Sequence, residues 1–339
     1  MTSLPLAITT GDPGGVGPEI SLRVAIAERE VDRIAIFGDA GWLRERALHL
    51  GVPPSALREC GPDEAIQLAP GEIGLCDVGV RWDSEALAHR ASPQGGRAQL
   101  RTLDCAIEAA KAGRVRALVT APMSKEAVQL GHRGTAFRGH TEHLAQAAGL
   151  HDDDVTMLFL GPRLRVGLVT THISIASAPA EITLPRVLRT VRHTAEALLR
   201  SLPDKRGLRL GVTGLNPHAG EAGMFGDEEL HVIGPAIRAA ARLPPFADGR
   251  VELIGPLPAE TAFRIAATGE LDAVATMLHD QATIPSKILD WGSAVNVTWG
   301  LPFVRTSVDH GVAYAAAHSG EIDHSGMAAA LELARRLSA

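Results

Sequence analysis

The sequence predicts an α/β protein in which helices cover both faces of a largely parallel β-sheet. One observation is that short apolar or β-branched runs alternate along the chain with longer amphipathic segments. Another is that these runs are mostly apolar throughout, as strands are when both faces of a parallel sheet are buried. A third is that 45% of the 339 residues are hydrophobic, which is ample for a large core. A chain of this length is expected to form about two lobes.

Nine runs fit strands, because they are short, apolar and bounded by turn residues. These are Leu6–Thr9, Arg33–Phe37, Arg116–Thr120, Val155–Leu160, Arg165–Thr170, Leu208–Thr213, Val251–Ile254, Asp272–Leu278 and Ala294–Thr298. Seven longer segments fit helices. These are Pro18–Glu28, Gly95–Ala112, Glu142–Ala148, Pro185–Ser201, Asp227–Ala241, Ala259–Ala267 and Ser325–Leu337.

Two residues support the helix boundaries. Pro18 fits the first turn of its helix, where the missing N–H of proline has no intrahelical partner to lose. Gly113 follows the helix that ends near Lys111 and fits a left-handed cap. No clear linker divides the chain, so two lobes would share it discontinuously. We expect residues 1–135 with 295–339 in the first lobe and residues 136–294 in the second.

Charge and cysteine content narrow the functional class. The net charge of -6 and the pI near 6.2 argue against partners such as nucleic acid or an anionic membrane. The three cysteines, Cys60, Cys76 and Cys105, form no CxxC or finger pattern, so a disulfide framework or structural zinc cluster is not expected. The N-terminal residues do not resemble a secretory signal. No apolar run approaches the ~18 residues of a membrane span, so we expect a cytoplasmic protein.

A glycine-rich segment, residues 11–19, lies between the first expected strand and the first expected helix. Its glycines, at positions 11, 14, 15 and 17, do not fit the G-x-G-x-x-G dinucleotide fingerprint, and no Lys-Ser/Thr follows as in a Walker A loop. The segment could let a ligand approach closely. It could equally be a tight connection between strand and helix.

Three histidines follow three expected strands: His172, His218 and His279. Ligands of open α/β sheets bind beyond the carboxyl ends of the strands, so these imidazoles could converge on one divalent ion. Three protein nitrogens with an open position are typical of a catalytic metal site. Asp280 and Glu221 are neighbouring carboxylates that could support the ligands. The alternative is three unrelated polar residues at loop starts.

Two further segments carry groups that suit an anionic substrate. In residues 139–143, His140 or Thr141 could cap the following helix and leave N–H groups for an anion, although a plain helix cap would look the same. Lys287, Asn296 and Arg305 stand in apolar stretches, where polar groups are costly unless they are paired.

Arginine binds phosphate or carboxylate in a bidentate manner, and lysine supplies a point charge. Lys287 could also accept a proton if burial lowers its pKa. The alternative is internal ion pairs, of Arg305 with Asp309 and of Lys287 with Asp290.

Taken together, these motifs resemble the 4-hydroxythreonine-4-phosphate dehydrogenase family of pyridoxal phosphate biosynthesis. The resemblance covers nearly the whole chain. Its blocks are GDPGGVGPE at 11–19, GHTE at 139–142, TTH at 170–172, NPHAGE at 216–221, HDQ at 279–281 and GLPFVRTSVDHG at 300–311.

The resemblance implies an isocitrate/isopropylmalate dehydrogenase-like α/β/α fold, with two lobes and the active site in the cleft. That fold binds NAD without the Rossmann fingerprint. The implied cofactors are NAD or NADP and one divalent ion per site, whether zinc, magnesium, cobalt or manganese. The implied assembly is a homodimer in which the partner subunit supplies a ligand to each site.

The resemblance also assigns roles to residues. It implies His172, His218 and His279 as metal ligands, with Asp280 as a carboxylate beside the metal. It implies substrate contacts at His140, Thr141, Lys287, Asn296 and Arg305. Of these we expect Lys287, together with Asp280, to act in catalysis. The implied reaction oxidises a secondary alcohol of a phosphorylated threonine-type substrate, and the β-keto acid then loses carbon dioxide.

Four departures from the family pattern concern the exact substrate: Ala282, Glu260, Met224 and Trp299. Residues 120–126 and 284–287 are similar to a branch acting on 4-phosphothreonine, and a cis-dihydrodiol dehydrogenase is a further alternative. Outside this chemistry, an acyltransferase, a zinc hydrolase and a non-catalytic binding protein remain open. Bound metal would argue against the acyltransferase, and NAD binding would argue against the hydrolase.

Overall fold

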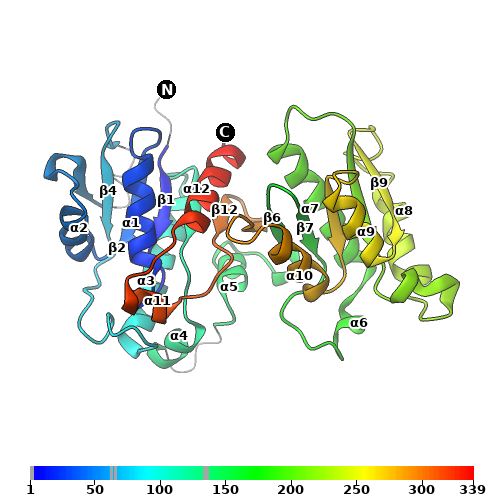
Figure 1. Ribbon diagram of the computed structural model, residues 1–339, viewed down its shortest axis with the longest axis horizontal. Helices are drawn as coiled ribbons and strands as arrows, with labels where there is room; N and C mark the ends of the chain where they lie inside the picture. The colour runs from blue at the N-terminus through cyan, green and yellow to red at the C-terminus, as the bar shows by residue number, and fades with distance from the viewer. Residues whose placement is uncertain (1–3, 62–63, 65–66, 133–136) are drawn as a thin grey trace. The chain divides into compact units, whose positions relative to one another are not determined.

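The computed structural model describes residues 4–61, 64, 67–132 and 137–339 (Figure 1). They form two compact units, Met1–Asp152 with Leu301–Ala339, and Asp153–Gly300. The first unit is therefore discontinuous in the chain. The lobe boundaries expected from the sequence, at residues 135/136 and 294/295, stay a prediction. No helix in the described part of the chain is long and apolar enough to cross a membrane.

The strands of the first unit are all parallel to their neighbours within it, in the order β3-β4-β2-β1-β5-β12. Its strands are β1 (Leu6–Thr9), β2 (Ile34–Gly38), β3 (Leu57–Cys60), β4 (Ile73–Asp77), β5 (Ala117–Thr120) and β12 (Val304–Ser307). Its helices are α1 (Gly17–Glu28), α2 (Ala40–His49), α3 (Pro93–Lys111), α4 (Lys125–Gly131), α5 (His140–Ala147), α11 (Tyr314–Ser319) and α12 (Ser325–Leu337).

Alternate residues of these strands build two core layers. Ala7 and Phe37 pack with Leu103 and Ile107 of α3. Their neighbours in sequence, such as Ile36, are equally buried but point to the opposite face, where α1 and α12 contact the sheet. Burial on both faces explains why these strands read as continuous apolar runs.

The second unit has the strand order β11-β6-β7-β10-β8-β9. Its strands are β6 (Thr156–Leu160), β7 (Arg165–Leu168), β8 (Leu208–Thr213), β9 (Val251–Leu257), β10 (Ala273–Thr276) and β11 (Val295–Trp299). Only β6 runs antiparallel to its neighbours among the described strands. The helices are α6 (Ala178–Glu181), α7 (Leu184–Ser201), α8 (Gly234–Ala240), α9 (Ala259–Ala267) and α10 (His279–Leu289).

Helices also cover both faces of the strands in the second unit. Ala273 and Ala275 of β10 belong to the cluster that contains α7 and α8 residues such as Val191. Val274, between them, belongs to the cluster with Ala262 of α9 and Ala282 of α10. The α/β class with a largely parallel sheet, predicted from the sequence, is therefore confirmed in both units.

Most predicted elements are present, and the misses have local causes. The predicted helix over Asp227–Ala241 is wrong in detail, because a short π-helical stretch, Glu229–Ile233, precedes α8 at Gly234-Pro235. Strands β3, β4 and β12 and helices α2, α4, α6, α10 and α11 were not predicted. The β12 sequence VRTS has little apolar character, and α10 contains Pro285, so neither gives a clear periodic signal.

Candidate active site

The three candidate histidines follow three neighbouring strands of the second unit. His172 follows β7, His218 follows β8, and His279 begins α10 directly after β10. Because β10 pairs in parallel with both β7 and β8, all three strands end at the same edge of the sheet. The topology therefore delivers all three imidazoles to one edge, as the sequence suggested.

His172 and His279 lie side by side. Their ring centroids are 5.5 Å apart and the rings are inclined by 46°. The strands that carry them are tied together beyond the ladder, because the Thr170 hydroxyl donates to the Met277 carbonyl at 2.6 Å. Two imidazoles at this separation suit adjacent positions around one ion.

Asp280 orients His279. Its Oδ1 lies 2.7 Å from Nδ1 of His279, so a proton on Nδ1 leaves the Nε2 lone pair for a ligand. The Asp280 side chain is largely exposed and lies beside the imidazole, at the position of a carboxylate that supports a metal ligand. The supporting role that the sequence suggested for Asp280 stays a prediction.

His218 sits in an unusual backbone turn. Five consecutive residues, His218 to Ala222, have φ between 45° and 80°, although only Gly220 among them is a glycine. Left-handed backbone at non-glycine residues costs about 1–2 kcal/mol per residue. This loop therefore needs support from its surroundings.

The buried carboxylate of Glu229 supplies that support. It accepts hydrogen bonds from the backbone N–H groups of Leu215 and Asn216, each at 2.8 Å, and from Nδ2 of Asn216 at 3.0 Å. Gln281 of α10 extends the link, because its Nε2 donates to the carbonyl of Gly214 at 3.3 Å. The loops that carry His218 and His279 are thus joined. Glu229 was missed by the sequence analysis, and only its place inside an apolar helical pattern hinted at it.

Within the described residues, no three His, Cys, Asp or Glu side chains come close enough to hold a metal ion. The pair His172–His279 can supply two ligands, so a complete centre needs a further group.

Lys287 and Asn296 occupy less buried positions than their apolar flanks suggest. Lys287 lies on α10 with its Nζ 5.8 Å from the centroid of the exposed Trp291 ring. Asn296 lies in β11 opposite Phe159 of β6 and is partly exposed. Asp290, considered above as a partner for Lys287, is buried and accepts hydrogen bonds from the backbone of Arg163 and Leu164.

In the first unit, Arg305 is buried and charged. It lies in β12 with 2% of its surface exposed, and its Nη2 donates to Oγ1 of Thr120 at 2.7 Å. Burial lowers the pKa of Arg305 to about 9, against a smaller opposing effect of Glu142. At neutral pH the guanidinium therefore stays positive, and a buried charge of this kind favours an anionic partner.

His140 lies at the start of α5 and is held neutral. Burial, followed by the positive charges of Arg305, His143 and Lys125, puts the pKa of His140 well below its usual value. Its Nε2 is enclosed and has no hydrogen-bond partner among the described residues. Buried polar atoms are rarely left unpaired, so this nitrogen marks a place for a ligand atom. Thr141 follows in the first turn of α5 and is partly exposed.

Lys125, which the sequence analysis missed, belongs to the same surroundings. A Cβ added at Gly139 would lie 3.6 Å from its Nζ, and its charge lowers the pKa of His140. Lys125 begins α4 shortly after β5, so its place at a strand end was the available signal.

The glycine-rich segment packs tightly against protein. A Cβ at Gly11 would lie 2.2 Å from the Pro122 carbonyl oxygen, and one at Gly15 would lie 2.3 Å from Val312. Between them, buried Asp12 accepts hydrogen bonds from the backbone of Gly14, from Gln99 and from Tyr314. At these glycines the tight-connection interpretation accounts for the sequence.

The four departures from the family pattern lie in different environments. Ala282 is fully buried in α10, and Met224 is largely exposed beyond the His218 loop. Glu260 lies in the first turn of α9, where it accepts a hydrogen bond from Thr261. Trp299 donates from Nε1 to Glu196 at 3.1 Å. None of these interactions involves His172, His218 or His279.

Comparisons with known proteins identify one family. The family model described as "Pyridoxal phosphate biosynthetic protein PdxA" matches residues 30–334. The chain is 40% identical over 336 residues to 4-hydroxythreonine-4-phosphate dehydrogenase of Geobacter metallireducens, covering 98% of this chain and 95% of that protein. A relative from Oceanobacillus iheyensis, named as a D-threonate 4-phosphate dehydrogenase, is 38% identical over 98% of this chain and 97% of its own.

Comparison with solved structures identifies the same family. The 4-hydroxythreonine-4-phosphate dehydrogenase of Klebsiella pneumoniae has a TM-score of 0.81 and 35% identity, covering 99% of this chain and all of that one. A terephthalate 1,2-cis-dihydrodiol dehydrogenase from Burkholderia xenovorans is less similar, with a TM-score of 0.69 and 27% identity over 98% and 97% of the two chains. A β-decarboxylating dehydrogenase of Thermococcus kodakarensis shares the fold alone, at 10% identity, a TM-score of 0.50, and 96% and 82% coverage.

Proposed function

The chain belongs to the PdxA family, and we propose that it is a 4-hydroxythreonine-4-phosphate dehydrogenase, an oxidoreductase of pyridoxal phosphate biosynthesis. Identity of about 40% along almost the full length supports this reaction class. The structural observation that carries the proposal is the enclosed Nε2 of His140 together with the buried, charged Arg305.

This pair suits the phosphate of the substrate. Arg305 supplies a permanent positive charge at neutral pH, because its pKa of about 9 lies above 7. His140 remains neutral, so its Nε2 can donate to or accept from a phosphate oxygen according to its tautomer. Thr141 adds a hydroxyl in the same helical turn. An anion that is held by several donors in a water-poor site gains more than it would at a surface.

The proposed metal ligands are His172, His218 and His279, with one of the three supplied to each centre by a second copy of the chain. The neighbouring rings of His172 and His279, and the contact of Asp280 with His279, support this assignment. When bound, a divalent ion such as zinc, magnesium, cobalt or manganese lowers the pKa of the substrate hydroxyl and stabilises negative charge during decarboxylation. The shared centre implies a homodimer.

Lys287 is proposed to take the proton of the secondary hydroxyl, and Asn296 to hold the substrate by hydrogen bonding. When bound, NAD or NADP would supply the oxidant, accepting the hydride that the same carbon loses. The alcohol thereby becomes a ketone, and the β-keto acid can lose carbon dioxide. Lys287 and Asp280 are thus the proposed catalytic groups, one accepting a proton and the other positioning His279.

A second candidate substrate is D-threonate 4-phosphate. It is favoured by the relative of that name, whose 38% identity is close to that of the dehydrogenases acting on 4-hydroxythreonine 4-phosphate. The acyltransferase alternative has little support, since a phosphotransacetylase of Staphylococcus aureus shares only the fold at 10% identity.

The test is NADH or NADPH formation followed by absorbance. Metal-supplemented protein is given 4-hydroxythreonine 4-phosphate, D-threonate 4-phosphate and an unphosphorylated diol, each with a chelator control. We expect chelator-sensitive oxidation of 4-hydroxythreonine 4-phosphate. Faster turnover of D-threonate 4-phosphate would transfer the proposal to the second candidate. Turnover of the diol alone would refute the phosphate site.

A further inference from the structure

Two free thiols of the first unit, Cys60 and Cys76, lie against each other on neighbouring strands. They are paired residues of the parallel strands β3 and β4, and their Sγ atoms are 3.4 Å apart. Neighbouring strands lie about 4.8 Å apart, within the roughly 4.4–6.8 Å between Cα atoms that a disulfide spans. The two sulfurs would need to approach by only about 1.3 Å to reach the disulfide bond length of about 2.05 Å.

The surroundings hold both sulfurs on the same face of the sheet. Cys60 and Cys76 belong to the buried cluster that contains Leu103 of α3. Gly74 lies two residues before Cys76 in β4 and presents no side chain on that face. A Cβ at Gly74 would lie 3.4 Å from Sγ of Cys60, so the glycine leaves room for this sulfur beside Cys76.

The two thiols differ in a way that suits a nucleophile and a resolving partner. Cys60 is the last residue of β3, the outermost strand in the described sheet order, and is 6% exposed, whereas Cys76 is fully enclosed. The hydrogen bond with Cys76 lowers the pKa of Cys60, against the opposing effect of burial. The same hydrogen bond, followed by burial, raises the pKa of Cys76 well above its usual value. A small oxidant therefore reacts first at Cys60, and Cys76 is in place to attack the product.

Both cysteines adjoin residues that connect them to helix α2. This helix precedes β3 in the chain and packs against β4. Glu59, directly before Cys60, pairs with Arg44 of α2 at 2.5 Å. Asp77, directly after Cys76, pairs with Arg81 at 3.1 Å.

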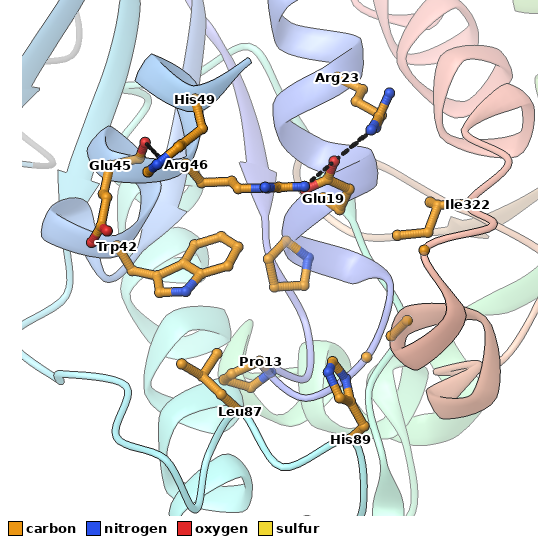
Figure 2. A pocket seen from close by; sticks show the side chains of 14 residues that line it. Pro13, Glu19, Arg23, Trp42, Glu45, Arg46, His49, Leu87, His89 and Ile322 are labelled. Carbon is orange, nitrogen blue, oxygen red and sulfur yellow. Dashed lines mark hydrogen bonds and ion pairs between the residues drawn. The ribbon is translucent and has the colours of Figure 1, made fainter.

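Arg81 continues this connection to the first turn of α2. It donates to Oδ1 of Asp39 at 2.7 Å, and Asp39 caps α2 by accepting hydrogen bonds from the N–H groups of Gly41 and Trp42 at 3.0 and 3.2 Å. Figure 2 shows α2 along one side of a pocket of about 450 Å³, to which it supplies Trp42, Glu45, Arg46 and His49. A covalent bond between β3 and β4 therefore restrains the strands on which this side of the pocket rests.

We propose that Cys60 and Cys76 form a reversible oxidation site for hydrogen peroxide, and that the resulting disulfide fastens the edge strand β3 to β4 and restrains α2. The Cys60 thiolate attacks one peroxide oxygen and the O–O bond breaks, so Cys60 becomes a sulfenic acid. The hydroxide that leaves takes up the proton that Cys60 had lost. The Cys76 sulfur then attacks the Cys60 sulfur, the S–O bond breaks, and hydroxide leaves with the proton of Cys76 as water. Two thiols are thus oxidised to one disulfide, and one peroxide is reduced to two waters.

The test uses the full-length protein, first reduced and then exposed to hydrogen peroxide without substrate. Alkylation of the remaining thiols, proteolysis and mass spectrometry should show the Cys60 peptide joined to the Cys76 peptide, with Cys105 alkylated. Dithiothreitol should restore all three thiols by exchange. Hydrogen exchange should slow several-fold at the amides of β3 and α2 in the oxidised protein, with α9 of the second unit as an unchanged reference.

Three variants assign the reaction to its residues. Cys60→Ser should lose the link. Cys76→Ala should lose it too, and should leave Cys60 as a sulfenic acid that dimedone traps. Cys105→Ser is the matched control, because it removes a partly buried thiol of α3 at the margin of the same cluster and should keep the link. Circular dichroism of the reduced proteins shows whether each variant is folded.

Two results would overturn the inference. One is a parent protein in which peroxide leaves Cys60 and Cys76 unlinked, or carries Cys60 on to the sulfinic acid. The other is a linked protein whose α2 amides exchange as fast as in the reduced form, which would remove the restraint on α2. Neither measurement uses a substrate, so a failure of the proposed function would leave both results as they are.

Discussion

Replacing Arg305 by methionine tests the phosphate site most directly. Arg305 is 2% exposed, so its guanidinium would meet the phosphate with little competing water. A hydrogen bond to a charged group contributes about 1.5–3 kcal/mol, which corresponds to a loss of roughly 10- to 150-fold. We therefore expect KM for the phosphorylated substrate to rise by about that factor, with a smaller change in kcat.

Loss of the charge alone should not lower the free energy of unfolding of Arg305→Met. In the folded protein the pKa of Arg305 falls to about 9, because burial disfavours the charged form. Below this pH, the buried charge costs stability, and that cost disappears as the pH rises above the folded pKa. Methionine removes this cost, although the substitution also removes the guanidinium that donates a hydrogen bond to Oγ1 of Thr120.

A thermal-shift assay with inorganic phosphate separates binding from stability. Phosphate should raise the melting temperature of the parent protein and leave that of Arg305→Met unchanged. Steady-state kinetics then give KM and kcat. An unchanged KM in a folded variant would refute the reasoning, and so would an equal rise in KM for an unphosphorylated substrate.

The remaining predictions concern pH and the metal centre. KM for the phosphorylated substrate should rise as the pH passes about 9, because Arg305 loses its charge there, and a pH profile of kcat/KM checks this against Arg305→Met. His218→Ala should abolish chelator-sensitive turnover while keeping the fold; activity without added metal would contradict the ligand assignment. Asp280→Asn should weaken metal binding by about 10- to 100-fold, measured by competition with a chromophoric chelator. Metal affinity should fall on dilution below the dimer dissociation constant, as sedimentation and metal titration together can show.

Sequence reasoning worked best where one residue type has one physical requirement. The apolar flanks of Arg305 predicted a buried position, and the structure shows only 2% of its surface exposed. The same argument overestimated burial at Lys287 and Asn296, which are partly exposed. Lys287 lies late in α10, where a helix presents one side chain to the core and its neighbour to water.

Other features required the tertiary structure. Edge strand β3 has a half-exposed LREC pattern, so its apolar signal is too weak to separate from a loop. The π-helical stretch before α8 carries Glu229, whose carboxylate serves a loop thirteen residues earlier along the chain. A hydrogen bond between residues far apart in the sequence leaves no periodic pattern by which it could be predicted.

The candidate metal centre could be predicted from the sequence only in part. Strand order explains why three histidines reach one edge, because β10 lies between β7 and β8. It does not fix the distances between side chains that follow the strands by different loop lengths. His279 begins a helix directly after β10, whereas His218 is the first residue of a left-handed stretch that follows β8 by several residues. That loop stores backbone strain at non-glycine residues, and such strain persists only where the surroundings enforce it. The supporting carboxylate of Glu229 and the strained turn together set the position of His218 beyond β8.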